Sequence, residues 1–244
     1  MQQEINNDLY HDLGDKWYTA KDDPVALLRA ESKIHVPWIN SNINPNAKIL
    51  DVGCGGGFLS NPLSELGHDV TGLDISKESL EVAKKYDTSK RVKYIAADAR
   101  AIPLPDNSFD VIISMDFLEH VSEVQEVVSE ISRILKPGGL FFFHTFNRNP
   151  VAHLVAIKFV EWFVKNTKKN LHVIDMFIKP EELKENLNKA GLKQIELKGV
   201  GLKVFTKAFL KGLFTGAIPD DFGFKFTKST LISYSGIARK ENEH

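Results

Sequence analysis

The sequence predicts an α/β fold in which helices cover both faces of a mostly parallel sheet. Short apolar runs alternate with amphipathic stretches from residue 48 to residue 145, which is the pattern of strands joined by crossover helices. The run at 140–145 is almost wholly apolar, as expected for a central strand buried on both faces. With 244 residues, 43% of them hydrophobic, the chain is long enough to bury one large core.

The expected elements follow in chain order. Residues 1–45 are predicted to form a helical preface, and an Asn-rich run at 41–46 ends it. Its expected buried anchors are Trp17, Leu27, Leu28, Ile34 and Trp38. Strands are predicted at 48–52, 70–73, 92–97, 109–114 and 140–145. Helices at 58–66, at 76–86 with Ser76 as its N-cap, and at 121–135 lie between them.

The alternation stops after residue 145. A hydrophobic, basic helix at 151–165 is expected to belong to an inserted lid at 149–178. A helix at 180–190 and strands at 194–198 and 231–238 follow, so that the predicted sheet has seven strands. Residues 200–230 are interpreted as a second, irregular insertion. Because no repeat or linker divides the chain, we expect a single domain over 1–244.

Composition excludes several classes of protein. Lys and Arg (31) nearly balance Asp and Glu (32), so no overall field favours nucleic acid. No stretch approaches the roughly 20 apolar residues that span a bilayer, and the polar N-terminus does not resemble a signal peptide. The single cysteine, Cys54, excludes an internal disulfide. We expect a cytoplasmic protein, either soluble or peripheral on the inner face of the membrane, and the sequence does not indicate its oligomeric state.

A glycine-rich loop follows the first predicted strand. It reads Asp51-Val52-Gly53-Cys54-Gly55-Gly56-Gly57 and opens a helix. Glycine permits a tight turn and a close approach of the backbone to a ligand, and the N–H groups at a helix start bind polar groups. The dinucleotide pattern G-x-G-x-x-G fails, since its third glycine would fall on Phe58 or Ser60.

Two acidic residues end the next two strands. Asp74 lies about 20 residues after the loop, where a carboxylate accepts hydrogen bonds from both ribose hydroxyls. Asp98 is positioned to bind an adenine amino group, with the amide of Ala99 beside it. Ile75 and Met115, at the same sheet edge, complete the predicted cofactor contacts together with Gly53 and Gly55. The cofactor predicted by this set is a methyl donor, S-adenosylmethionine.

Three residues after the fourth strand are candidates for the chemistry. A helical turn would bring together Asp116, Glu119 and His120, and two carboxylates and an imidazole suit a divalent metal ion. Alternatively, His120 acts alone as the general base. The candidate catalytic residues are therefore His120 and Glu119. A third interpretation is that Glu119 and His120 only orient the following helix. His68 and His144 are expected to be structural.

The basic helix at 151–165 suggests a second kind of surface. Lys158, Glu161, Lys165 and Lys168 share one stripe at helical spacing, and apolar residues that include Trp162 and Phe163 cover most of the rest. A wide apolar face flanked by lysines suits a membrane surface or the mouth of an apolar substrate channel. A lid packed on the core, or a dimer contact, is the alternative. The segment 205–214 is expected to extend the same surface.

Several motifs carry a family resemblance. The glycine loop resembles that of Rossmann-like class I methyltransferases. More specific blocks resemble the ubiquinone-biosynthesis O-methyltransferases. These are Ser114-Met115-Asp116-Phe117-Leu118-Glu119-His120-Val121, Leu135-Lys136-Pro137-Gly138-Gly139, Thr145-Phe146-Asn147-Arg148-Asn149, His172 and Phe177-Ile178-Lys179-Pro180. The resemblance covers about residues 17–192.

The resemblance implies methylation of a phenol or catechol hydroxyl on a hydrophobic, polyprenylated ubiquinone precursor. It also implies that the acidic and histidine residues at 116–120 hold a divalent ion such as Mg²⁺, and that the lid contacts lipid. A basic residue of the preface, either Arg29 or Lys33, would contact the cofactor. A methyltransferase for another small hydrophobic substrate is the alternative within this class. A module that binds the cofactor or a lipid without turnover is the alternative from a different class.

Overall fold

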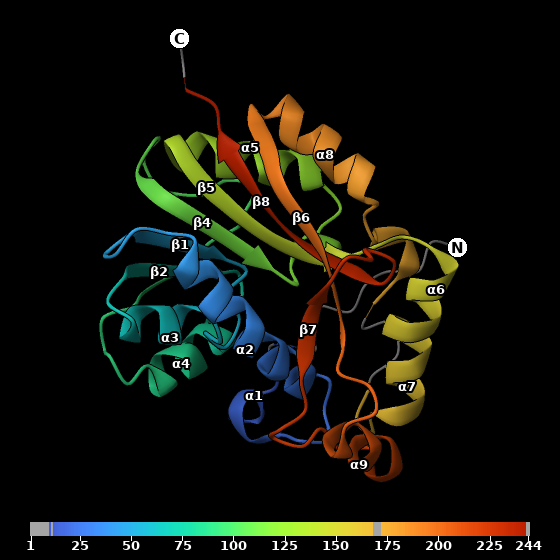
Figure 1. Ribbon diagram of the computed structural model, residues 1–244. Helices are drawn as coiled ribbons and strands as arrows, with labels where there is room; N and C mark the ends of the chain where they lie inside the picture. The colour runs from blue at the N-terminus through green and yellow to red at the C-terminus, as the bar shows by residue number, and fades with distance from the viewer. Residues whose placement is uncertain (1–9, 11, 168–171, 243–244) are drawn as a thin grey trace.

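Eight strands form one sheet in the computed structural model, which describes residues 10, 12–167 and 172–242 (Figure 1). They are β1 (Lys48–Val52), β2 (Asp69–Asp74), β3 (Lys93–Ala96), β4 (Phe109–Met115), β5 (Leu135–Phe146), β6 (Leu192–Leu202), β7 (Phe224–Thr227) and β8 (Ser233–Lys240). Their order across the sheet is β3-β2-β1-β4-β5-β8-β6-β7.

The first five strands run parallel, as predicted. β2 and β3 lie on one side of β1, and β4 and β5 lie on the other. The strand order therefore reverses between β1 and β4, and open α/β sheets bind ligands at the carboxyl edge beside such a reversal. β8 pairs antiparallel with both β5 and β6, which makes the sheet mixed.

Helices cover both faces of this sheet. α5 (Val124–Ile134) and α8 (Pro180–Lys189) pack on one face. α2 (Val25–Ser41) and α3 (Ser60–Glu65) pack on the other, and α4 (Lys77–Tyr86) lies against β2 and β3. The side chain of Ser76 accepts a hydrogen bond from the amide of Ser79, which confirms the predicted N-cap. The Rossmann-like α/β fold predicted from the alternation is confirmed.

The preface begins with α1 (Lys16–Thr19), followed by α2. The indoles of Trp17 and Trp38 are buried, whereas Leu27, Leu28 and Ile34 are half-buried. Trp38 packs edge-on against Phe142 of β5, with ring centroids 5.2 Å apart. The two tryptophans thus anchor the preface, and the three aliphatic residues contribute less than expected.

The largest difference from the prediction lies in residues 200–230, which are not irregular. They contain α9 (Lys207–Thr215), which Thr206 caps, and the short strand β7. β7 pairs with the end of β6, so the sheet has eight strands rather than seven. A four-residue Phe-Lys-Phe-Thr strand has too short an alternation to be recognised. Its pairing with β6 and its packing on α2, where Phe226 lies 5.2 Å from the indole of Trp38 (ring centroids), stabilise it.

The lid is helical where helix was expected. It consists of α6 (Pro150–Ala152), capped by Asn149, the π-helical segment η3 (His153–Phe159) and α7 (Val160–Phe163). The 3₁₀ turn η4 (Ile174–Met176) follows. Lys168, predicted to complete the charged stripe, lies outside the described residues. No helix in the described part of the chain is long and apolar enough to cross a membrane.

Candidate active site

A cavity of about 720 Å³ opens at the carboxyl edge of the parallel strands, beside β1 and β4. Most of the predicted site residues line it. They are Gly53, Gly55, Asp74, Ile75, Asp98, Ala99, Met115, Asp116 and His120. They meet there because parallel strands bring their carboxyl ends to one edge of the sheet.

The glycine loop has the backbone conformation that its sequence predicts. Gly53 and Gly55 have positive φ angles, +74° and +49°. A Cβ atom at Gly53 would lie 2.3 Å from the ring of Phe117, and one at Gly55 would lie 2.7 Å from the indole of Trp17. The turn therefore requires glycine for its dihedral angles and for the close approach of its neighbours.

Asp74 holds this loop in place. Its Oδ2 accepts a hydrogen bond from the amide of Gly55 (2.9 Å), and its Oδ1 accepts one from the amide of Ser76 (2.9 Å). Both carboxylate oxygens are thus oriented by the backbone.

Asp98 lies at the outer wall of the cavity, next to an arginine that sequence reasoning did not single out. The guanidinium of Arg100 donates to Oδ2 of Asp98 at 2.7 Å. These hydrogen bonds hold the pKa of Asp98 below its usual range. Asp98 is therefore an anionic acceptor at neutral pH, as a carboxylate that binds an amino group must be.

The preface closes the other side of the cavity. The ring of Tyr10 stacks on Trp17 (centroids 5.7 Å apart) and lies edge-on to His120 (5.7 Å). Neither Arg29 nor Lys33 lines the cavity. Arg29 donates to the main-chain carbonyls of Trp17 and Ala20, and Lys33 to that of Asp220. In this structure both basic residues hold segments of the chain together.

Glu119 and His120 lie deeper, in the 3₁₀ turn η2 (Leu118–His120). A ligand atom from each of Glu119, His120 and His172 lies within 4.8 Å of the other two. Oε2 of Glu119 accepts a hydrogen bond from Thr145 (2.8 Å), whereas its buried Oε1 has no hydrogen-bond partner. An orphaned buried carboxylate oxygen beside two imidazoles fits a divalent cation. Asp116 is not part of this group of three and lies beside His144 instead.

Burial sets the protonation of this group. Desolvation, followed by repulsion from Asp116, raises the pKa of Glu119 to about 8. Desolvation, followed by the nearby His172, lowers the pKa of His120 to about 3. His120 is therefore a neutral imidazole at physiological pH. In that form it is a good metal ligand but a weak base toward a phenol.

An apolar cavity of about 110 Å³ adjoins the first one. Tyr10 and Leu28 line both cavities. Phe159 and Phe163 of the lid and Phe209 of α9 form part of its wall. The cavity at the strand ends thus adjoins an apolar compartment whose wall is formed in part by the two insertions.

Sequence reasoning missed several residues of the site. Tyr10 lies in a polar stretch without periodicity, and nothing in its neighbourhood marks it. His172 was noted only as part of a family motif, and its approach to His120 (ring centroids 5.4 Å apart) depends on the path of the lid. His144, expected to be structural, lies with Glu31 and His35 in a second buried group. The almost wholly apolar run at 140–145 indicated that His144 is buried but not what it faces.

Comparisons with known proteins show which class of protein shares this fold. Residues 50–143 match a family model described as a methyltransferase domain. The fold is shared with a methyltransferase from Bacillus halodurans (TM-score 0.61, 20% identity, 86% of this chain and 98% of that one). It is also shared with magnesium protoporphyrin IX methyltransferase from Synechocystis, solved with bound S-adenosylhomocysteine (TM-score 0.60, 17% identity, 89% and 85% of the chains). Fold and site together define a class I S-adenosylmethionine-dependent methyltransferase.

The family is more specific than the class. The ubiquinone biosynthesis O-methyltransferase of Burkholderia pseudomallei is 34% identical over 208 residues, covering 82% of this chain and 88% of that protein. The chain belongs to the ubiquinone biosynthesis O-methyltransferase family.

Proposed function

We propose that this enzyme transfers the methyl group of S-adenosylmethionine to a phenol or catechol hydroxyl of a polyprenylated ubiquinone precursor. The observation that carries the proposal is the junction of the two cavities at Tyr10 and Leu28. A cofactor at the strand ends would present its methyl group toward this junction, while an apolar tail would occupy the compartment beyond it. Family membership supports the same acceptor class.

Different residues of the cavity at the strand ends would bind different parts of the cofactor. The backbone of Gly53 and Gly55 admits the cofactor closely, Asp74 accepts from the ribose hydroxyls, and Asp98 accepts from the adenine amino group. Ile75, Ala99 and Met115 supply apolar contact to the adenosine. Tyr10 and Trp17 cover the site and exclude water, which favours transfer to the acceptor over hydrolysis.

The reaction moves a methyl group from the sulfonium sulfur to an oxygen, and the hydroxyl proton is lost. A methyl sulfonium is already electrophilic, so the protein must mainly align the acceptor with it. Glu119 and His120, with His172, would hold a divalent ion. Such an ion, when bound, lowers the pKa of a coordinated catechol hydroxyl. The low pKa of His120 favours this role over that of an unaided general base.

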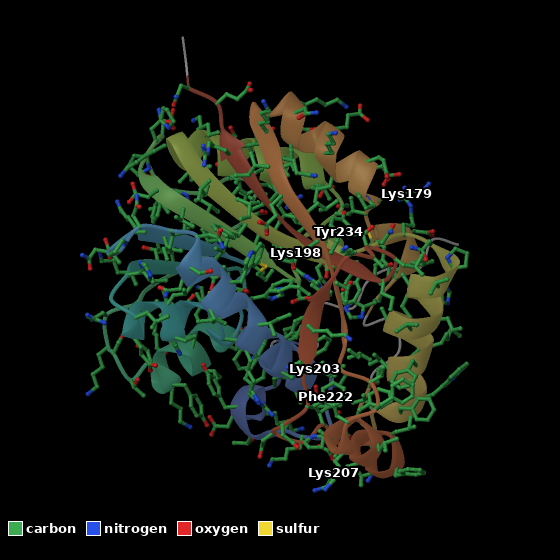
Figure 2. The ribbon with its side chains drawn as sticks, viewed as in Figure 1. Lys179, Lys198, Lys203, Lys207, Phe222 and Tyr234 are labelled. Atoms are coloured by element: carbon green, nitrogen blue, oxygen red, sulfur yellow. The ribbon has the colours of Figure 1, made fainter. Side chains whose placement is uncertain are left out.

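Peripheral binding to the membrane belongs to the same proposal. Three aromatic side chains of α7, α9 and the turn before α9 project into solvent, with exposed fractions of 66% for Trp162, 91% for Phe205 and 85% for Phe214. α7 and α9 lie side by side at one corner of the molecule (Figure 1). Lys203 and Lys207 lie at the same end (Figure 2). Aromatic side chains flanked by lysines are typical of surfaces that bind anionic lipid.

The lid and α9 also supply walls of the apolar cavity. The proposed membrane surface and the proposed tail compartment are therefore two sides of the same helices. An acceptor dissolved in the bilayer would reach the cavity without crossing water.

A turnover assay with a demethylated quinol analogue tests the function. We expect methylation that stops when a chelator is added and is restored by Mg²⁺. The Glu119→Gln variant should lose at least about tenfold in kcat while binding S-adenosylhomocysteine normally. Turnover insensitive to chelator would reject the metal, and no turnover of any phenolic acceptor by a protein that binds the cofactor would reject the enzyme assignment.

A further inference from the structure

A carboxyl group lies in the wall of the apolar cavity. Glu31, on α2, lines this cavity together with apolar side chains of the lid and α9. Leu27 and Leu28, one helical turn earlier, line it too, since residues three and four apart share one face of a helix. The side chain of Glu31 is only 6% exposed. Because burial of an unpaired carboxyl costs free energy, an acid in this apolar wall requires a polar partner.

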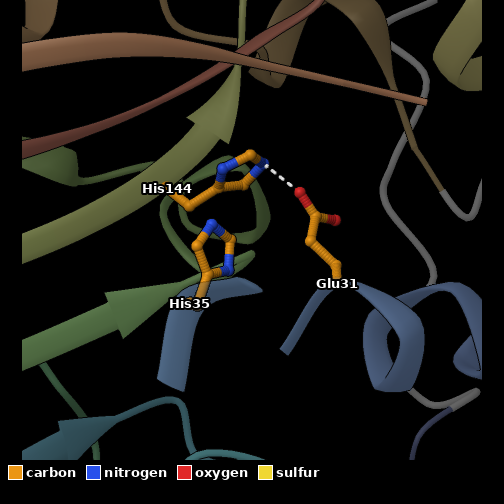
Figure 3. Close-up of side chains that lie close together, drawn as sticks. All are labelled: Glu31, His35 and His144. Atoms are coloured by element: carbon orange, nitrogen blue, oxygen red, sulfur yellow. Dashed lines mark ion pairs between the residues drawn. The ribbon is translucent and has the colours of Figure 1, made fainter. Parts of the chain in front are cut away.

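The carboxyl of Glu31 is not satisfied by the protein. Its Oε1 is buried without a hydrogen-bond partner, and so is Nε2 of His144, which lies 3.3 Å from it (Figure 3). The second carboxyl oxygen, Oε2, points away from the ring of His144 (Figure 3). Leaving a buried oxygen unpaired costs about 1–3 kcal/mol. An acid that costs the fold this much stability indicates a role in binding a ligand.

The hydrogen bonds around His144 leave Oε2 of Glu31 free to accept. Oγ of Ser235 is 2.9 Å from Nδ1 of His144 and 2.9 Å from Nε2 of His35. The hydroxyl has one proton. If Ser235 donates it to His144, Nε2 of His144 carries a proton and faces Oε1 as a donor. If Ser235 donates it to His35, Nε2 of His144 faces Oε1 with a lone pair. Both arrangements engage Oε1 and leave the lone pairs of Oε2 available.

Glu31 also lies near the residues that would bind the reacting hydroxyl. His172, which forms a group with Glu119 and His120, lines the same apolar cavity as Glu31. Desolvation, followed by repulsion from Asp116 and Glu119, raises the pKa of Glu31 well above its ordinary value, so these two acids are close to its carboxyl. An acceptor ring with its reacting hydroxyl beside His120 and its tail in the apolar cavity would therefore pass Glu31.

We propose that Glu31 determines specificity for the acceptor ring, because its carboxyl accepts a hydrogen bond from a second hydroxyl group, other than the one that is methylated. This inference rests on the function proposed above. A buried group that bonds a hydroxyl is left unpaired by an analogue without that hydroxyl, so the site rejects the analogue. The enzyme should therefore prefer a ring with two hydroxyl groups to a ring with one.

The surroundings of Glu31 do not produce this preference by themselves. Aromatic and aliphatic side chains of the lid and α9 line the apolar cavity, and an apolar wall favours the acceptor with fewer polar groups. A metal ion held by Glu119 and its two histidines would also bind a second hydroxyl, but it would do so in wild type and in a Glu31 variant alike. A comparison of two acceptors in both proteins therefore isolates the contribution of Glu31.

Steady-state kinetics with two matched acceptors test this role. One is a prenylated ring with two hydroxyl groups, and the other carries hydrogen in place of the second hydroxyl. Wild type should prefer the first. In Glu31→Leu the ratio of the two kcat/KM values should fall about 10- to 100-fold, mainly because the KM for the dihydroxy acceptor rises. Glu31→Gln should keep most of the preference, since its amide oxygen still accepts a hydrogen bond.

Glu196→Leu is the matched control. Glu196 accepts a hydrogen bond from Nε1 of Trp38 on α2 (3.1 Å) but lines neither cavity, so its loss should leave the preference unchanged. Glu31→Met repeats the test if Glu31→Leu does not fold. A preference that survives the loss of the Glu31 carboxyl, or falls as much in Glu196→Leu, would overturn this inference and leave the proposed function in place. If wild type methylates neither acceptor, the proposed function itself is wrong, and this inference with it.

Discussion

Single residues set the properties of the cofactor loop. Asp74 orients Gly55 and Ser76 with one oxygen each, so a change of one atom at this position affects the conformation of the loop. Asp51 lies beneath the same loop, buried, and Oδ2 accepts a hydrogen bond of 2.5 Å from Ser60. Neither role is visible in the glycine pattern itself.

The Asp74→Asn variant should bind S-adenosylhomocysteine about 10- to 100-fold more weakly, a loss of roughly 1.5–3 kcal/mol. An amide must turn its NH₂ group toward the N–H of either Gly55 or Ser76, and it cannot accept from both while accepting from ribose. Calorimetry measures the change. Asp69→Asn, at the exposed start of the same strand, should bind normally. Equal affinities of the two variants would contradict the role of Asp74.

At the scale of elements, the two insertions form much of the wall of the apolar cavity. η3, α7 and α9 are not needed to complete the sheet, and their inner faces line the apolar cavity. The rings of Phe159 and Phe209 stack with centroids 6.4 Å apart, which joins the lid to α9. The outer faces carry the exposed aromatic side chains, so the same short helices have two apolar sides.

Flotation with anionic vesicles tests the outer faces. Wild type should float, and Trp162→Glu and Phe214→Glu should each reduce the bound fraction at least about tenfold, because a charge replaces a side chain that would enter the interface. Leu66→Glu is the matched control, since Leu66 is also exposed (52%) but ends α3, across the molecule from α7. If the wild-type protein remains in the soluble fraction, the membrane proposal is wrong.

At the scale of the whole molecule, the site concentrates buried acids and histidines. Desolvation raises the pKa of Asp51 and of Asp116 to about 7. It lowers the pKa of His120 to about 3 and that of His172 to about 4. The histidines stay neutral in the folded protein above these values, whereas the acids keep their protons up to about neutral pH.

The cofactor-free protein should therefore lose stability as the pH rises from 6.5 to 8. The folded pKa of Asp51 exceeds its unfolded value of about 3.9, so the folded state holds the extra proton and unfolding becomes easier as it is lost. The buried histidines make the free energy of unfolding increase with pH, but only below their unfolded pKa of about 6.5. Over this pH range, the free energy of unfolding of Asp51→Asn should fall by about 1 kcal/mol less than that of wild type.

Urea denaturation in the presence of a chelator measures this free energy of unfolding at each pH. Asp69→Asn, an exposed carboxylate, should leave the slope unchanged. An equally steep decline in Asp51→Asn would show that Asp51 does not titrate in this range.

The sequence by itself determined the fold class and the edge of the sheet at which the candidate cofactor residues gather. Strand and helix periodicities and turn residues are local properties of the chain. Because the carboxyl ends of parallel strands share one edge of the sheet, the sequence alone predicts that Gly53, Asp74 and Asp98 lie close together. The specific motifs after Ser114 also indicated the family.

Only the tertiary structure decided which side chains meet across elements that are distant in sequence. β7 forms because β6 offers it an edge. His172 lies beside His120 although the two are far apart in the sequence, and Glu31 reaches His144 because α2 packs on the sheet. Such contacts depend on three-dimensional packing rather than on periodicity. The chemistry of the acceptor side of this site was therefore not readable from the order of residues alone.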